Sequence, residues 1–271
     1  MFAKKRDRHT AVNFGDDVSY RETVMLLKSL GSALELLRYF TSRQPVWGVR
    51  ELARECGAHH SVVHRILATF AADGYLVQDE LGHYALGLRW FEMGEIVRQT
   101  VSPTEIVAPV LHRLKEMSGE TVFLSVLDNR EGLCLDIAHS DQQLRFSIEQ
   151  GKRFPLHLGA HAKAMLAFMP EDERADIYAR EAAMGGTADV AALEASLEQV
   201  RMNGWVQTWE EATPGVTGIA VPVWMKSRSR VAGSISVCGP RQRIDDSCVP
   251  RMLELLREAQ RNIEGVVGLL R

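Results

Sequence analysis

Three histidines and an arginine fall within eight residues of the sequence, in the stretch HHSVVHRI from His59 to Ile66. His60 and His64 are four residues apart, the spacing that sets two imidazoles on one side of a helix to bind zinc. The zinc-binding H-E-x-x-H motif needs a glutamate directly after its first histidine, and that position is Ser61 here. The stretch can be a metal site, a solvated surface or a surface that contacts a partner, and the missing ligands argue against the metal.

A second histidine pair, His157 and His161, has the same four-residue separation. It can hold a metal, or one histidine can cap a helix while the other lies near a ligand, and we favour the second interpretation. The four cysteines (Cys56, Cys134, Cys238 and Cys248) lie far apart without a C-x-x-C pair. We therefore expect buried thiols in a reducing compartment, and neither a metal nor another cofactor.

No recognisable catalytic set appears among the remaining polar residues. The sequence has no G-x-S-x-G elbow, no P-loop and no G-x-G-x-x-G motif. Glu210 and Glu211 are adjacent, so on a strand their carboxylates would face opposite ways. We expect that the chain is not an enzyme.

Targeting signals are also missing from the sequence. No run of about 18 apolar residues exists to span a membrane, and the charged first residues lack the apolar core of a signal peptide. These features predict a cytoplasmic protein without a membrane partner, with residues 1–23 forming a disordered basic tail.

The elements around HHSVVHRI predict a DNA-binding fold. Apolar residues recur at three- and four-residue steps between positions 26 and 40, a short helix around Leu52 ends at Gly57, and a third helix runs from about His59 to Ala72. The stretch YLVQDELGHYALG then alternates around a polar turn, as a β-hairpin does. Two short helices joined by a tight turn and followed by a hairpin predict a winged helix-turn-helix over residues 24–87.

Helical geometry separates the side chains of the third helix. At 100° per residue, Val63 and Leu67 turn inward, Ser61, Arg65 and His64 project from the exposed face, and His60 lies apart from them at its shoulder, near the helix start. In helix-turn-helix proteins the first turns of this helix enter the major groove, where arginine can pair with guanine or phosphate. The surface interpretation with DNA as the partner is therefore favoured.

The distribution of charge supports this interpretation. The whole chain has a formal charge of −3, but residues 1–100 hold 13 Lys and Arg against 12 Asp and Glu, and five arginines fall within residues 38–65. A local basic face can bind nucleic acid on an acidic chain. The predicted DNA-contacting residues are Arg43, Arg50, His59, His60, Ser61, Val62, His64, Arg65, Thr69, Gln78 and His83.

The remaining sequence predicts a linker helix over residues 88–101 and an α+β domain over residues 102–271. A helix at 104–118 precedes three strands (TVFLSVLD, LCLDIA and LRFSIEQ), and GAHAKAMLAFM reads as a helix that stops at Pro170. Two more helices near 171–180 and 191–203, three strands (WVQTW, GIAVPVW and RVAGSISVCG) and a helix over about 245–270 complete it. Strands in this arrangement favour a largely antiparallel sheet.

Together these motifs resemble the IclR family of bacterial transcriptional regulators. The resemblance runs through SLGSALELLRYF, VRELARECGAHHSVVHRILATFAADGYL and GHYALGLRWFEMG, and then through GETVFLSVLD, GKRFPLHLGAHAKAMLAF, EEATPGVTGIAVPV and SISVCGP. It implies a winged helix-turn-helix joined by a linker helix to a GAF-like domain that binds a small effector. It also implies a homodimer or a dimer of dimers that binds double-stranded DNA and represses or activates a catabolic operon.

The resemblance also implies an effector pocket, whose family positions match particular residues of this chain. Thr208 and Trp209 stand where many members have an acidic pair, Gly218 replaces a frequent cysteine, and Cys238 replaces the second serine of a Ser-x-Ser motif. These departures make the pocket more apolar and aromatic. The predicted effector-binding residues are Leu144, Phe146, Gly159, Ala160, His161, Trp209, Val216, Gly218, Ser236 and Cys238.

An aromatic or otherwise hydrophobic organic acid is the effector that this composition favours, since apolar walls with a few polar groups suit a ring. Its carboxylate would meet the start of the helix that begins at Ala160, near His161, and its ring would meet Phe146 or Trp209. Alternatively, Phe146 and Trp209 belong to the core, the effector is a small polar acid such as glyoxylate or pyruvate, or the second domain serves oligomerisation only.

The expected mechanism is a repressor whose paired recognition helices read a pseudo-palindromic operator. Effector binding would change the geometry of the dimer or tetramer and thereby the affinity for DNA.

Overall fold

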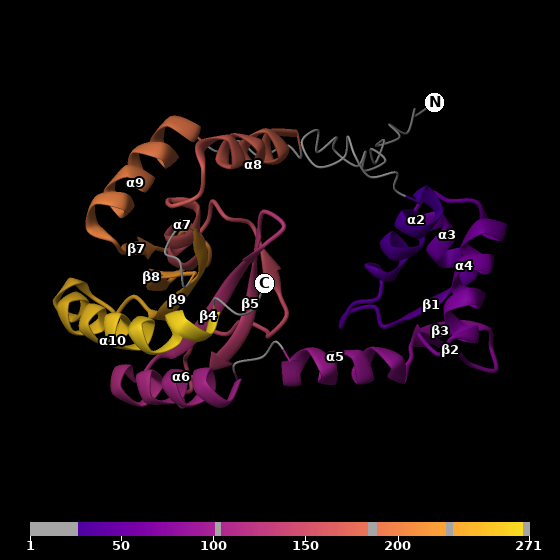
Figure 1. Ribbon diagram of the computed structural model, residues 1–271, viewed down its shortest axis with the longest axis horizontal. Coiled ribbons are helices and arrows are strands. Elements are labelled where there is room, and N and C mark those ends of the chain that lie inside the picture. The colour runs from indigo at the N-terminus through magenta and orange to yellow at the C-terminus, as the bar shows by residue number, and fades with distance from the viewer. Residues whose placement is uncertain (1–26, 101–103, 184–188, 226–229, 268–271) are drawn as a thin grey trace, which may run out of the picture. The chain divides into compact units, whose positions relative to one another are not determined.

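A computed structural model describes residues 27–100, 104–183, 189–225 and 230–267. The chain divides into two compact units, unit 1 (residues 1–97) and unit 2 (residues 98–271), and the division falls within the helix α5 (Leu88–Thr100), at the position predicted for a linker helix (Figure 1). The tail predicted over residues 1–23 lies outside the described residues. No helix in the described ranges is long and apolar enough to cross a membrane.

Unit 1 is a winged helix-turn-helix. Its helices before α5 are α2 (Lys28–Leu37), α3 (Val49–Glu55) and α4 (His60–Ala72), and its strands are β1 (Val46–Gly48), β2 (Leu76–Gln78) and β3 (His83–Leu86). The three strands form an antiparallel sheet in the order β1-β3-β2. The hairpin of β2 and β3 was predicted, whereas β1 was not, because the stretch after Pro45 is only three residues long and reads as a helix break.

The core of unit 1 fixes how α2 and α4 are turned. Val63 and Leu67 of α4 are fully buried against Leu52 of α3. On α2, however, the apolar positions Leu30 and Leu34 are about half exposed, at 53% and 50%. The apolar residues of α2 therefore fall on two sides of the helix, one packed into the core and one, with Leu30 and Leu34, partly exposed.

Unit 2 is built on a six-stranded antiparallel sheet in the order β6-β5-β4-β9-β8-β7. Its strands are β4 (Thr121–Asp128), β5 (Glu131–Ala138), β6 (Arg153–Phe154), β7 (Val206–Trp209), β8 (Val216–Trp224) and β9 (Val231–Pro240). Its helices are α6 (Thr104–Ser118), α7 (Ala160–Leu166), α8 (Glu171–Ala183), α9 (Val190–Asn203) and α10 (Val249–Val267). The chain is thus an α+β protein, as predicted.

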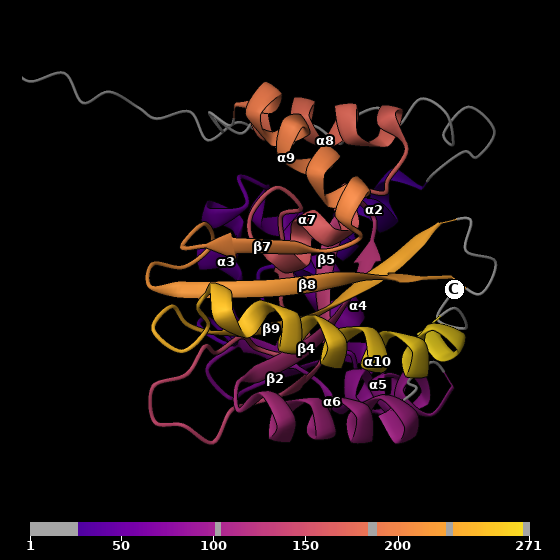
Figure 2. The same ribbon diagram turned by 90° about the vertical axis from the view of Figure 1, so that its left-hand side faces the viewer.

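Helices cover both faces of this sheet (Figures 1 and 2). On one face α6 and α10 pack beside each other, and alternate residues such as Leu124, Ile219 and Ile235 face them. On the other face lies α7, with α9 packed behind it. We call the side of the sheet that carries α7 the α7 face.

Three predicted elements of unit 2 differ from the structure. The stretch LRFSIEQ (144–150) forms no strand, and the edge of β5 instead bonds to Lys152 and to β6. The helix expected to run to Pro170 ends at Leu166. The closing helix begins at Val249, after a short 3₁₀ turn.

Candidate functional site

The first turn of α4 is held by His59. Its Nδ1 accepts a hydrogen bond from the Ser61 backbone N–H at 3.4 Å and lies 2.8 Å from the Ser61 hydroxyl. A side chain that accepts from this N–H satisfies one of the free donors at a helix start. With Val63 buried beneath, this cap turns Ser61 and Val62 outward.

His60 and His64 lie together on the exposed side of α4. Their rings stack at 6.5 Å between centroids with 10° between their planes. The predicted separation of these two histidines was wrong, because side chains four residues apart lie above one another on a helix. Neither ring is buried.

Arg65 follows on the same exposed surface. Within the described ranges its guanidinium makes no hydrogen bond or ion pair, while its backbone carbonyl accepts from the Thr69 hydroxyl at 2.8 Å. Arg43 and Arg50 are also exposed, and no ion pair engages them in the part of the chain that the structure describes. These guanidinium groups are free to bind an anion.

The hairpin residues predicted to contact DNA are partly engaged within the hairpin. The Asp79 carboxylate accepts from the backbone N–H groups of Leu81 and His83 and lies 3.2 Å from the His83 ring. The pKa of the Asp79 carboxyl is lowered, mainly by the hydrogen bond that it accepts from the backbone N–H of His83. Gln78 donates to the Gly82 carbonyl at 3.3 Å, so Gln78 and His83 both stabilise the turn of the wing.

The register of the central strands of unit 2 gathers polar side chains on the α7 face. Ser125 of β4 pairs with Ser234 of β9, and Phe123 pairs with Ser236. Because successive strand residues point to opposite faces, these four side chains share one face. The Ser234 hydroxyl donates to the carbonyl of His161 in α7 at 2.8 Å, which identifies that face as the one beneath α7.

Aromatic rings line the same face. The His161 ring lies edge-to-face with Phe123 at 5.2 Å and with Phe154 at 4.4 Å, and Phe123 lies 5.8 Å from Phe146. Burial lowers the pKa of His161 to about 4. The imidazole is therefore uncharged at neutral pH and can donate or accept a hydrogen bond without burying a charge.

Two hydroxyls on this face have no partner. Ser125 and Ser236 are fully buried, and neither Oγ atom forms a hydrogen bond within the described part of the chain. Ser236 was among the predicted effector residues, whereas Ser125 was not. The signal for Ser125 was its position as a single hydroxyl in the apolar strand TVFLSVLD.

The start of α7 is joined to the loop before β8 by an ion pair between residues that were not predicted as part of the site. Lys163, whose side chain is 10% exposed, donates to Glu211 at 2.7 Å, and the other Glu211 oxygen lies 3.4 Å from the Gly159 backbone nitrogen. Gly159 has φ +87°, and a Cβ there would lie 2.9 Å from the His161 ring. Glycine at this position lets the chain turn tightly into α7.

Gly218 leaves room between α7 and the sheet. A Cβ at this position would lie 3.0 Å from the Cys238 sulfur and 3.3 Å from Ala160. Burial raises the pKa of the Cys238 thiol to about 12, and that of Cys134 likewise. Both thiols are therefore protonated and unreactive in the folded protein.

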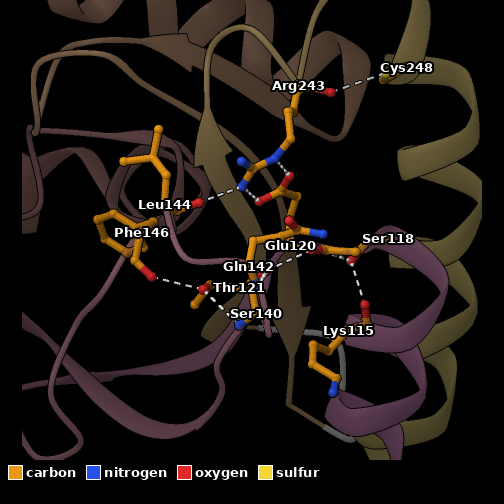
Figure 3. Close-up of polar contacts among 11 residues, drawn as sticks. Lys115, Ser118, Glu120, Thr121, Ser140, Gln142, Leu144, Phe146, Arg243 and Cys248 are labelled. Carbon is orange, nitrogen blue, oxygen red and sulfur yellow. Dashed lines mark hydrogen bonds and ion pairs between the residues drawn. The ribbon is translucent and has the colours of Figure 1, made fainter.

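The loop 141–150 is attached to the sheet by its backbone (Figure 3). Arg243 binds the buried Glu120 carboxylate through two nitrogens, one at 2.8 Å, and also donates to the carbonyl of Leu144 at 2.8 Å. The Thr121 hydroxyl donates to the Phe146 carbonyl at 2.8 Å and accepts from the Ser140 N–H. These contacts hold Phe146 against Phe123 without a strand partner.

The structure brings together most of the predicted effector residues and separates two of them. Phe146, His161, Ser236 and Cys238 share the α7 face, together with residues that border it (Gly159, Ala160, Val216 and Gly218). Trp209 pairs with Thr217 and is 47% exposed, whereas its neighbour Thr208 is buried beside Gly218. Strand alternation thus puts Trp209 on the opposite face, and the prediction for it was wrong. The side chain of Leu144 is 68% exposed and lies outside this group, and only its backbone carbonyl is engaged, by Arg243.

Comparisons with known proteins identify relatives of both units. The sequence model described as IclR helix-turn-helix domain matches residues 29–80. The model described as bacterial transcriptional regulator IclR C-terminal matches residues 98–265. The chain is 30% identical over 252 residues to the transcriptional repressor IclR of Escherichia coli (strain K12), spanning 90% of this chain and 92% of the relative.

Two solved structures share the fold over most of their length. An IclR family transcriptional regulator from Brucella abortus has a TM-score of 0.75 at 24% identity, covering 88% of this chain and 91% of its own. An IclR homolog complexed with 4-hydroxybenzoate, from Microbacterium hydrocarbonoxydans, has a TM-score of 0.71 at 22% identity, covering 90% and 99% respectively.

Proposed function

The chain belongs to the IclR family of bacterial transcriptional regulators, and we propose that it is a cytoplasmic, ligand-responsive repressor of a catabolic operon. Members of this family are regulators rather than enzymes, often repressors, with a DNA-binding helix-turn-helix and a ligand-binding C-terminal domain. The finer proposal concerns which residues read DNA, which effector is bound and how the chain assembles.

The exposed face of α4 carries the proposal for DNA recognition. Its free Arg65 guanidinium and the outward Ser61, Val62 and His64 present a donor, a hydroxyl, a methyl surface and an imidazole within two helical turns. Side chains of these types form the hydrogen bonds and apolar contacts that distinguish bases in the major groove. Arg43 and Arg50 would bind phosphates, while Gln78 and His83 shape the wing.

The test is binding of a DNA fragment from upstream of the gene, located by footprinting, to the Arg65→Ala protein. Losing a bidentate contact should weaken binding about tenfold or more in fluorescence anisotropy at fixed salt. The control is Arg257→Ala on α10, which removes the same charge from an exposed position in unit 2. Equal losses in both variants would show that the effect comes from net charge and would contradict the assignment.

For the effector we propose an aromatic or otherwise hydrophobic organic acid that binds at the α7 face of unit 2, which we call the effector site. The rings of Phe123, Phe146 and Phe154 support a ring-bearing ligand. The carboxylate would lie near the start of α7, where Lys163 would exchange its Glu211 partner for the carboxylate of the ligand. The homolog complexed with 4-hydroxybenzoate makes this compound the first to test.

Thermal shift assays with 4-hydroxybenzoate and glyoxylate separate the two classes of acid. We expect the aromatic acid to raise the melting temperature, because a ligand that binds only the folded state stabilises it. A shift with glyoxylate alone would replace the aromatic effector by a small polar one. A lack of response to any organic acid would favour a C-terminal domain that serves oligomerisation only.

A homodimer or dimer of dimers is the assembly that we propose. Leu27, Leu30 and Leu34 form an exposed apolar stripe on and just before α2, and Leu88 and Phe91 are 79% and 73% exposed on α5. Apolar surface of this extent on a domain of this size is typical of an association site. Two copies would place two recognition helices on a pseudo-palindromic operator.

A further inference from the structure

The effector site contains two buried hydroxyls without partners, and they lie on neighbouring strands. Ser125 on β4 is opposite Ser234, and Ser236 is opposite Phe123, so the two serines are diagonal neighbours across β4 and β9. Both are fully buried, and neither Oγ atom has a protein partner among the described residues. A hydroxyl that has lost water without gaining a partner is costly, and a bound ligand can provide the partner.

The surroundings of Ser125 are suited to a flat ring. The aromatic side chain of Phe123 lies next to Ser125 along β4 and opposite Ser236 of β9, and its ring contacts His161 and Phe146. On β5, Cys134 pairs with Ser125 and presents a protonated thiol, since burial raises its pKa to about 12. Ser125 is therefore a hydrogen-bonding group within an apolar, aromatic wall.

The charges bordering this wall are already compensated. Lys163 is bonded to Glu211 at 2.7 Å, and Arg243 is bonded to Glu120 at 2.8 Å. The His161 ring faces Phe123 without a charge at neutral pH. The group of the ligand that meets Ser125 should therefore be uncharged, because a buried charge needs a counter-charge.

We propose that Ser125 is a specificity-determining residue of the effector site, which recognises an uncharged phenolic hydroxyl on the ring of the effector. This inference rests on the proposed function of unit 2 as the binding site of an aromatic acid. The serine can both donate to and accept from a phenol, whereas an unsubstituted ring leaves its hydroxyl unpaired.

Isothermal titration calorimetry of the full chain with 4-hydroxybenzoate and benzoate tests the inference. We expect the natural protein to bind 4-hydroxybenzoate about tenfold more tightly than benzoate, and Ser125→Ala to remove that preference while leaving the affinity for benzoate unchanged. The matched control is Thr217→Val, which removes another buried, unpartnered hydroxyl, on the face away from α7. It should alter neither affinity.

Because Ser125→Ala removes an unpartnered buried hydroxyl, its melting temperature should equal or exceed that of the natural protein. Ser125→Cys, which retains the volume of the side chain, is a second variant that also lacks the hydroxyl. Should Ser125→Ala and Ser125→Cys weaken both ligands equally, or neither, Ser125 does not read the phenol and the inference is overturned, while the aromatic effector stands. Should neither compound bind the natural protein, the aromatic effector and the inference fail together.

Discussion

At the scale of single residues, His161 shows how the fold sets the chemistry of the effector site. Its ring contacts Phe123 and Phe154, and its backbone carbonyl is bonded by Ser234. Burial lowers its pKa from 6.5 to about 4. A histidine at this position supplies polarity without charge, which suits the aromatic effector that we propose.

His161 should make the protein less stable in mild acid. Between pH 6.5 and 4 the unfolded chain binds a proton that folded His161 does not, so the free energy of unfolding falls as the pH is lowered through this window. The difference in pKa corresponds to on the order of 3 kcal/mol by pH 4, and to about 2 kcal/mol at pH 5. His161→Phe should lose this part of the pH dependence.

Urea unfolding at pH 7.5 and pH 5 measures the effect for both proteins. The natural protein should lose more stability than His161→Phe between the two values. An identical loss in both proteins would mean that the imidazole is charged, or hydrated, in the folded state.

At the scale of elements, the loop 141–150 is positioned by Arg243. This side chain bonds both oxygens of Glu120, which is 4% exposed, and the carbonyl of Leu144 (Figure 3). Two residues later in the loop, Phe146 packs on Phe123. The ion pair therefore links the sheet to the loop that carries Phe146.

Arg243→Gln should destabilise unit 2 and loosen this loop. The substitution leaves the Glu120 carboxylate buried without its cation, which costs on the order of 3 kcal/mol. Arg113→Gln is the control, because its partner Glu258 is 40% exposed and such surface pairs contribute about 1 kcal/mol or less. Urea unfolding and amide hydrogen exchange of residues 141–150 measure both effects, and equal results for the two variants would contradict the role of Arg243.

The loop also shows what a sequence pattern can and cannot predict. The alternation of Leu144, Phe146 and Ile148 indicated an extended segment, and Phe146 and Ile148 do pack on the core. Whether such a segment joins a sheet depends on a free strand edge, and the turn at 151–152 occupies the edge of β5 here. The side-chain bonds from Arg243 and Thr121 come from positions 99 and 25 residues away, which periodicity cannot reveal.

Other elements followed from local signals. The helix α4 was predicted to within one residue at its start, because two buried and two partly buried apolar positions share one face and Gly74 lies just beyond its end. The mistake over Trp209 arose because β7 is an edge strand, where a large apolar residue can face outward. Ser125 and Lys163 were not predicted, because the sequence does not show whether a single polar residue within an apolar strand or helix faces a site. Only the contacts made in the folded chain show this.

At the scale of the whole molecule, self-association should depend on the apolar stripe of α2. Leu30→Glu combined with Leu34→Glu places charges on residues that are about half exposed in the single chain, so folding should be little affected while a dimer is weakened. We expect a smaller mass in light scattering and weaker operator binding. Met202→Glu, at a 62% exposed position on α9, is the control.

Retention of the full oligomer by the α2 variant, with unchanged operator affinity, would show that this stripe is not the association site. A loss of helix content in circular dichroism would instead show that Leu30 and Leu34 support the fold of unit 1.

The central claim is that an aromatic acid bound in unit 2 controls DNA binding by unit 1. Fluorescence anisotropy of a labelled operator fragment, titrated with the full chain at fixed salt with and without saturating 4-hydroxybenzoate, tests it most directly. We predict that the ligand changes the apparent Kd for the operator by about fivefold or more, the range of ordinary allosteric coupling. An identical Kd with and without the ligand, at a concentration where calorimetry shows the ligand bound, would contradict the account.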